Sequence, residues 1–170
     1  MRDIGFNLFG KDKFCENVFS KTFEPPPGTK AGVVCAFEVL EHILDPIEFL
    51  AEQLRSFQSD SIVVSTSVFE GCPPDLTWAY YSFESGQHLS FYQPRTLQLI
   101  AGALGCQYFR LGIDLHLMTK RQVPPWKLFL LTTRFVRDVH RMGTRYTRRH
   151  RSLTVADYEL VRRRVLTASD

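Results

Sequence analysis

Two apolar strand-like segments, separated by a capped helix, constrain the fold of this chain more than any other feature. Residues 31–37 form a continuous apolar run, and residues 61–66 form a second segment rich in β-branched side chains. Such runs are typical of strands buried on both faces, as in a parallel sheet. Between them, Asp45 and Pro46 are suited to be the N-cap and first residue of a helix. The order predicts a βαβ unit with a right-handed crossover, and therefore an α/β fold.

Apolar periodicity and Gly/Pro punctuation predict the remaining elements. Further strands are predicted at residues 6–10, 106–111 and 113–119, and helical segments at residues 14–19, 94–104, 125–139 and 154–165. The last two strands meet near Gly112 and are expected to form an antiparallel hairpin. Residues 68–92 form a long connection rich in aromatic side chains. A connection of this length in a compact domain usually carries function, or else marks a misassigned element.

Composition excludes several classes of protein. The chain is 44% hydrophobic and 23% charged, as globular proteins are. It contains no apolar run long enough to predict a transmembrane helix, and its first residues do not resemble a secretory signal. The four cysteines form no Cys-x-x-Cys pair. This pattern favours reduced thiols in a cytoplasmic protein over a disulfide framework or a structural zinc site.

Charge divides the chain near residue 120. Residues 1–120 carry 9 Lys/Arg and 14 Asp/Glu, whereas residues 121–170 carry 12 Lys/Arg and 4 Asp/Glu. The basic part could bind an anionic partner such as nucleic acid or a lipid surface, although a solvated, Arg-rich helical tail is the simpler interpretation. We therefore expect one domain at residues 1–120 and a basic helical extension at residues 121–170.

The most informative segment follows the first buried strand, where residues 37–46 read Phe-Glu-Val-Leu-Glu-His-Ile-Leu-Asp-Pro. Ligands of open α/β sheets bind outside the carboxyl ends of the strands. Glu38, Glu41 and His42 share one face if the backbone turns helically there. Two carboxylates and an imidazole could hold a divalent cation or supply a general base. Glu41 and His42 could also form only a hydrogen-bonded pair that closes the turn.

Three further polar residues are candidates for the same site. His88, within the segment Gly-Gln-His-Leu-Ser-Phe-Tyr at residues 86–92, could complete a site of two carboxylates and two histidines, or could cap the helix that begins at Pro94. Asp12 follows the first predicted strand and is suited to accept hydrogen bonds from ribose hydroxyls, although turns favour Asp in any case. His116 alternates with two leucines in the last strand, and we interpret it as structural.

The Glu-x-x-Glu-His motif at residues 38–42, together with the Gly-Gln-His segment at residues 86–92, resembles class I S-adenosylmethionine-dependent methyltransferases. The resemblance extends from about residue 5 to residue 120 and is strongest to a bacterial branch found beside glycosyltransferases. It implies a Rossmann-like, doubly wound sheet of seven strands that ends in an antiparallel hairpin. It also implies transfer of a methyl group from S-adenosylmethionine to an oxygen of a small molecule or sugar.

The resemblance further implies roles for individual residues. Cofactor contacts would come from Asp12 at the ribose and from Phe37 and Glu38 at the methionine part. The catalytic residues would be Glu41, His42 and His88. The ligands of magnesium or another divalent ion would be Glu38, Glu41 and His42, with His88 as a less closely matched member. The wall on the acceptor side would be formed by Trp78, Tyr80, Tyr81 and Gln87.

The sequence departs from the family at its beginning. The glycine-rich turn that follows the first strand of the family is missing, and residues 1–5 resemble the end of the helix after that turn. We therefore expect an N-terminally truncated sheet that lacks its first strand and glycine loop, and that binds the cofactor weakly or not at all. The alternative function is a catalytically dead remnant that acts as a binding or assembly module. A nucleic-acid-binding tail at residues 145–151 and a peripheral membrane helix at residues 126–136 rank lower.

Overall fold

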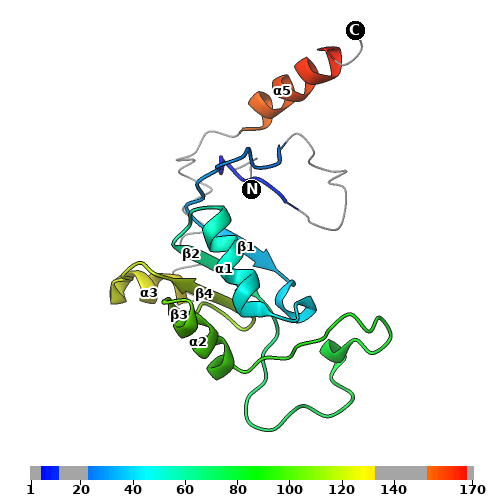
Figure 1. Ribbon diagram of the computed structural model, residues 1–170, viewed down its shortest axis with the longest axis vertical. Helices are drawn as coiled ribbons and strands as arrows, with labels where there is room; N and C mark the ends of the chain where they lie inside the picture. The colour runs from blue at the N-terminus through cyan, green and yellow to red at the C-terminus, as the bar shows by residue number, and fades with distance from the viewer. Residues whose placement is uncertain (1–4, 12–22, 133–152, 168–170) are drawn as a thin grey trace. The chain divides into compact units, whose positions relative to one another are not determined.

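The computed structural model describes residues 5–11, 23–132 and 153–167 (Figure 1). The chain divides into two units: residues 1–27 together with 135–170, and residues 28–134. The second unit contains the sheet and all the described candidate site residues. The predicted boundary at residue 120 stays a prediction.

The unit of residues 28–134 is built on a four-stranded sheet in the order β1-β2-β4-β3. Strand β1 (Val34–Phe37) runs parallel to β2 (Ser61–Ser65). Strand β4 (Leu115–Thr119) pairs antiparallel with both β2 and β3 (Gln107–Arg110). These pairings confirm the predicted parallel strand pair and the antiparallel final hairpin in a mixed α/β fold. The fuller doubly wound sheet of seven strands stays a prediction.

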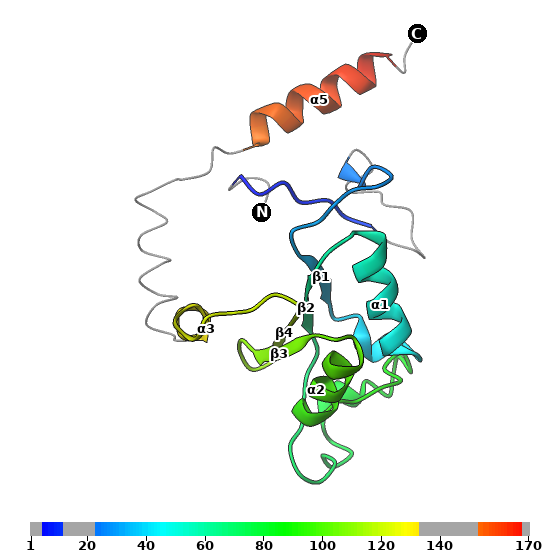
Figure 2. The ribbon, with the colours of Figure 1, turned by 60° about the vertical axis from the view of Figure 1, so that its left-hand side comes forward.

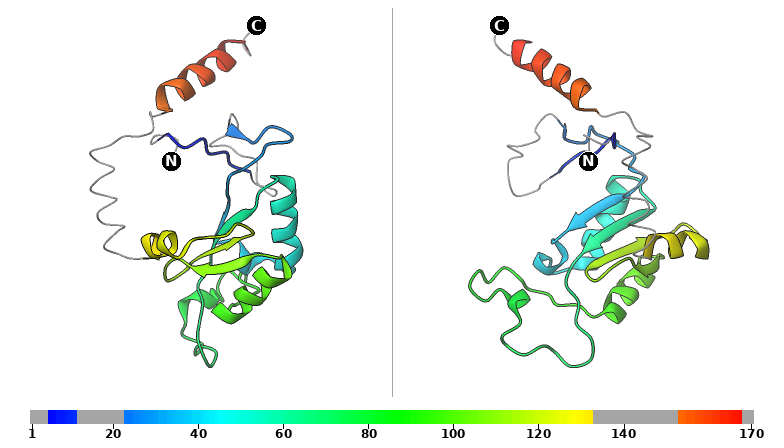
Figure 3. Two further views of the ribbon diagram at one scale, coloured as in Figure 1. Left: turned by 90° about the vertical axis from the view of Figure 1, so that its left-hand side faces the viewer. Right: turned by 180° about the vertical axis from the view of Figure 1, so that it is seen from behind.

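Helices α1 (Pro46–Ser56) and α2 (Pro94–Ala103) lie on one side of this sheet (Figure 2 and Figure 3). Helix α1 begins as predicted, because the Asp45 carboxylate accepts a hydrogen bond from the Glu48 backbone N–H at 3.0 Å. Helix α2 is followed by Gly105, whose φ of 67° suits a residue without a side chain.

The hydrophobic core fills the space between the two helices and the sheet. Its buried members alternate along the strands and recur at helical spacing in α1 and α2, as the pleat and the helix period require. These members are Ala36, Ile62, Val64 and Met118 from the strands, and Leu50, Leu54, Leu97, Ile100 and Ala101 from the helices. Leu40 and Tyr92, outside these elements, complete the buried core.

Strand β1 differs from its prediction, because it is not buried on both faces. Cys35 and Phe37, which alternate with the buried Ala36, are exposed, and the Phe37 side chain is 52% exposed. The strand lies at the edge of the described sheet, and both helices cover the face to which Ala36 belongs. A continuous apolar run therefore indicated a strand correctly but did not establish how many of its faces are covered.

The predicted strand at residues 6–10 is wrong, because these residues form no β-strand. The Leu8 N–H donates to the Phe6 carbonyl at 2.9 Å, and the Gly10 N–H donates to the Phe23 carbonyl at 3.0 Å. A strand needs a ladder of hydrogen bonds with a partner strand, and a local apolar pattern cannot supply that partner. The predicted turn at residues 14–19 lies outside the described residues.

The predicted helices of the basic part are present where the structure describes them. Helix α3 spans Pro125–Thr132, and the rest of its predicted range lies outside the described residues. Helix α5 spans Thr154–Thr167. Trp126 and Phe129 in α3 are mostly exposed. No helix in the described ranges combines the length and the apolar character needed to cross a membrane.

Candidate functional site

The candidate site lies where β1 and β2 end. Glu38 directly follows β1 and has a φ of 51°, a left-handed conformation that interrupts the extended backbone. Its N–H donates to the carbonyl of Ser65, at 3.2 Å, and to the hydroxyl of the same residue, at 2.9 Å. A short 3₁₀ helix, η3 (Leu40–His42), begins two residues later. The strand end thus carries Glu41 and His42 on a tightly turned segment.

The long connection between β2 and α2 brings His88 to the same place. Figure 1 shows this connection as the green excursion that leaves the sheet and returns to α2. Its two ends are joined by a hydrogen bond from the Phe69 N–H to the Tyr92 carbonyl at 3.1 Å. Near His88, the N–H groups of Leu89 and Ser90 both donate to the Glu41 carbonyl, at 2.7 and 3.1 Å. The connection is therefore bonded to η3 through its backbone.

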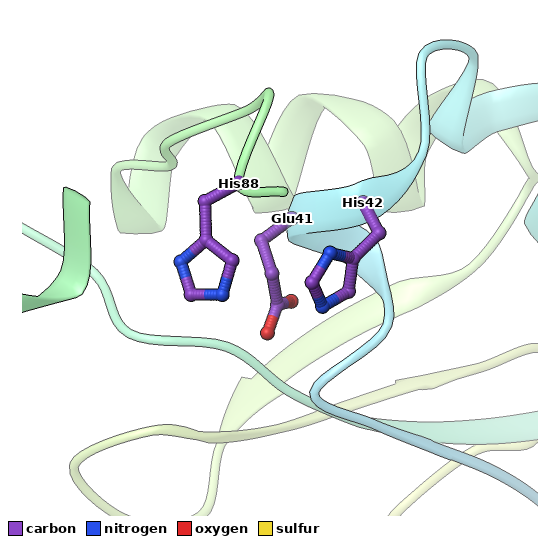
Figure 4. A group of neighbouring side chains, drawn as sticks. All are labelled: Glu41, His42 and His88. Carbon is purple, nitrogen blue, oxygen red and sulfur yellow. The ribbon is translucent and has the colours of Figure 1, made fainter. Parts of the chain in front are cut away.

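Glu41, His42 and His88 form a compact group of possible metal ligands. One ligand atom from each residue lies within 4.8 Å of the others. The two imidazole rings have centroids 4.9 Å apart. Figure 4 shows the Glu41 carboxylate between the two rings. One carboxylate and two imidazoles at this separation are a donor set that transition-metal ions bind.

Both histidines have one ring nitrogen engaged by the backbone. Nδ1 of His42 lies 2.9 Å from the Gln87 carbonyl, and Nδ1 of His88 lies 2.6 Å from the Tyr80 carbonyl. A carbonyl only accepts hydrogen bonds, so these contacts assign the proton of each neutral ring to Nδ1. Each Nε2 then has a free lone pair. Metal-binding histidines are commonly oriented in this way.

The Glu41 carboxylate is the strongest sign of a ligand site. The residue is fully buried, and within the described part of the chain neither carboxylate oxygen has a hydrogen-bond partner. Burying an unpaired charge is costly, and buried polar atoms in native proteins are nearly always satisfied. A cation bound between Glu41 and the two histidines would remove this cost, so the residues present fit a metal ion.

Glu38 does not join this group, although the spacing predicted that it would. Its carboxylate accepts a hydrogen bond from the Ser65 hydroxyl at 2.5 Å. The predicted common face needs a helical backbone from residue 38 to residue 42, but Glu38 is left-handed and η3 begins only at Leu40. Phe37 lies at the same strand end with an exposed side chain. Asp12, the predicted ribose contact, lies outside the described residues.

The residues predicted to form the acceptor wall belong to an aromatic cluster in the connection. The Trp78 ring contacts Tyr80 and Tyr81 at centroid distances of 5.2 and 5.1 Å. Tyr81 stacks on Phe83 at 5.2 Å, and the Phe83 side chain is 65% exposed. Gln87 was predicted to line the acceptor side. In the structure it contacts the site through its backbone carbonyl, which accepts a hydrogen bond from Nδ1 of His42.

Thr66 and His116 support the site from the sheet, and sequence reasoning had assigned neither of them to it. The Tyr80 hydroxyl lies 2.9 Å from the Thr66 hydroxyl. Nε2 of the fully buried His116 lies 3.3 Å from the Thr66 carbonyl, and its Nδ1 lies 2.9 Å from the Tyr108 hydroxyl. Burial raises the pKa of Tyr80 to about 12, and the nearby Glu41 charge adds to this shift. Thr66 is the last residue of the strand predicted at residues 61–66, and its position at the strand end could have indicated it.

Lowering the pH is expected to destabilise the protein through His116. Burial lowers the pKa of His116 in the folded state, so the unfolded chain binds this proton at a higher pH than the folded chain does. The stability that neutral His116 contributes is complete above its pKa in the unfolded chain, about 6.5. It is lost as the pH falls from that value toward the lower pKa of His116 in the folded protein. Urea unfolding should show a smaller loss of stability on acidification in His116→Gln than in the wild type. Equal losses in the two proteins would contradict this assignment.

Residues 1–111 match a protein family described as a methyltransferase domain, so the match covers 111 of the 170 residues. Comparisons with curated proteins and with solved structures find no match. The matched region includes β1, η3 and the part of the connection that carries His88.

Proposed function

Because this chain belongs to the methyltransferase-domain family, which transfers methyl groups and generally uses S-adenosylmethionine, we propose that it methylates an oxygen of a small molecule or sugar beside a bound divalent cation. Glu41, His42 and His88 would hold the cation. The observation that carries this proposal is the buried Glu41 carboxylate, which has no hydrogen bond among the described residues and lies between two imidazoles.

The donor set favours a transition-metal ion over magnesium. Imidazole nitrogen is a preferred ligand of zinc and of other late first-row metals, whereas magnesium prefers an all-oxygen environment. Three protein ligands also leave coordination positions for an oxygen of the acceptor, as catalytic metal sites do. With Glu38 bonded to Ser65, the site offers one carboxylate rather than the two expected from the sequence. We therefore propose zinc in place of magnesium.

The chemistry assigns separate tasks to the residues of the site. In methyl transfer, the bond between carbon and sulfur breaks, a bond between carbon and oxygen forms, and the acceptor loses a proton. A bound cation would lower the pKa of the acceptor hydroxyl, so that its proton could leave to water. In a site without an ion, the unbonded Glu41 carboxylate is placed to accept that proton itself. The exposed ring of Phe83, with Tyr81 behind it, would hold an apolar face of the acceptor and align its oxygen.

The cofactor side of the proposal rests on the end of β1. Phe37 presents an exposed aromatic ring there, and Glu38 presents a carboxylate held by Ser65. An aromatic surface and a fixed carboxylate suit the sulfonium and amino groups of the methionine part of S-adenosylmethionine. Asp12 would bind the ribose, as the resemblance implies.

Isothermal titration with S-adenosylhomocysteine tests the proposal. Although the missing glycine-rich turn predicts weak cofactor binding, methyl transfer by this chain requires micromolar binding. We expect Glu38→Gln to bind about tenfold or more weakly than the wild type, because that variant loses a charged hydrogen-bond acceptor. Glu84→Gln is the matched control, since Glu84 is an exposed carboxylate of the connection. If the folded wild type does not bind, methyl transfer is contradicted and the alternative of a non-catalytic binding or assembly module is favoured.

A further inference from the structure

We propose that Tyr80 and Thr66 are positioning residues that fix the tautomer and ring orientation of His88, so that its Nε2 is directed toward Glu41. The motif spacing assigns neither residue to this task. Its importance for catalysis rests on the proposed metal site, but the orientation of His88 can be measured without a metal.

Tyr80 contacts His88 in two independent ways. Its backbone carbonyl lies 2.6 Å from Nδ1 of His88 and accepts the proton of that nitrogen. Its ring lies against the imidazole at a centroid distance of 4.7 Å, with an angle of 56° between the planes. The first contact fixes the tautomer, and the second restricts rotation of the ring. Figure 4 shows the resulting orientation, with a ring nitrogen of His88 toward the Glu41 carboxylate.

Thr66 fixes Tyr80 to the sheet. The two hydroxyl groups are 2.9 Å apart, and Thr66 is fully buried directly after β2. The Thr66 N–H donates to the Asp114 carbonyl at 3.1 Å, and its own carbonyl accepts from Nε2 of His116 at 3.3 Å. Backbone bonds on both sides of Thr66 leave its hydroxyl little freedom to move. The Tyr80 side chain lies on a long connection, but its bond to Thr66 anchors it to the end of β2. Precise placement of a metal ligand requires such rigid support.

The neighbouring residue Tyr81 provides the contrast. It lies in the same short helix, η4 (Ala79–Tyr81), and its ring also contacts Trp78 and Phe91. Its hydroxyl, however, donates to the Pro74 carbonyl at 2.9 Å, within the connection itself. The two tyrosines therefore share the aromatic cluster but differ in what their hydroxyl groups contact. Tyr81→Phe is accordingly a matched control for Tyr80→Phe.

Two measurements on the full chain test the proposal. Long-range ¹H–¹⁵N NMR spectra report the tautomer of His88, and titration with Co²⁺ followed by its visible absorption reports affinity and ligand geometry. We expect Tyr80→Phe and Thr66→Val each to mix the tautomers of His88 and to weaken Co²⁺ binding about tenfold, as loss of partners behind metal ligands does. Tyr81→Phe and Thr66→Ser keep the Thr66–Tyr80 bond, so both should retain the wild-type tautomer of His88 and the wild-type affinity for Co²⁺.

The double variant provides a further check. Because Tyr80→Phe and Thr66→Val break the same bond, combining them should weaken Co²⁺ binding no more than either change alone. An unchanged His88 tautomer in both single variants overturns the positioning role, whatever the cobalt result. Absence of Co²⁺ binding by the wild type overturns the proposed metal site, and the NMR spectra still decide the role of Tyr80 and Thr66. Circular dichroism of every variant confirms that the protein is folded.

Discussion

A transition-metal ion at 100 times its dissociation constant is expected to raise the free energy of unfolding by about 2.7 kcal/mol. The proposed ion would bind the folded chain selectively, because η3 carries Glu41 and His42 whereas the distant connection carries His88. Thermal or urea unfolding with and without Zn²⁺ measures the effect directly. Magnesium at the same concentration should produce a much smaller shift.

Glu41→Gln is expected to abolish this stabilisation and to raise the stability of the metal-free protein. The wild-type carboxylate is buried without a hydrogen bond among the described residues, and removing its charge removes a cost of about 1 kcal/mol or more. Compared with the wild type, Glu41→Gln should be less stable with metal and more stable without it. This reversal distinguishes a metal ligand from a merely structural residue. Glu48→Gln serves as the control, because that exposed carboxylate pairs with the exposed Arg55 at the surface. A metal-dependent shift that survives in Glu41→Gln would rule out this residue as a ligand.

The second large effect is expected from Leu50→Ala, which should lower the free energy of unfolding by about 2–5 kcal/mol. Leu50 belongs to α1 and is fully buried where the helix packs on the sheet, so truncating its side chain removes apolar contacts and leaves a cavity. Leu44→Ala is the matched control, since that side chain is 85% exposed and should change stability by less than about 0.5 kcal/mol. Urea denaturation of both variants measures the difference. Similar losses in the two would mean that α1 is not packed on the sheet as described.

The elements that could be predicted from the sequence are those with local causes. The Asp45 cap, the Pro46 start and the stop at Gly105 depend on neighbouring residues, and the structure confirms them. The strand predicted at residues 6–10 failed, because a strand also depends on a partner that the local pattern does not contain. The same limit applies to the exposed face of β1.

The candidate site was predictable in its residue types but not in its grouping. The spacing placed Glu38 with Glu41 and His42. However, the backbone of Glu38 itself is left-handed, so its carboxylate does not join theirs. His88 joins the group through backbone hydrogen bonds between the connection and η3. The partners of both Nδ1 atoms are main-chain carbonyls, which every residue carries, so no side-chain pattern could indicate them.

The division of the ligands between two segments has a thermodynamic consequence. An ion shared by η3 and the connection would act as a removable cross-link, and it would order the aromatic cluster that is proposed to receive the acceptor. Any acceptor that binds the ordered cluster more tightly must then raise the affinity for the ion by the same factor. Metal occupancy and acceptor binding would therefore report on each other, and an acceptor could be identified through its effect on metal affinity before any product is detected.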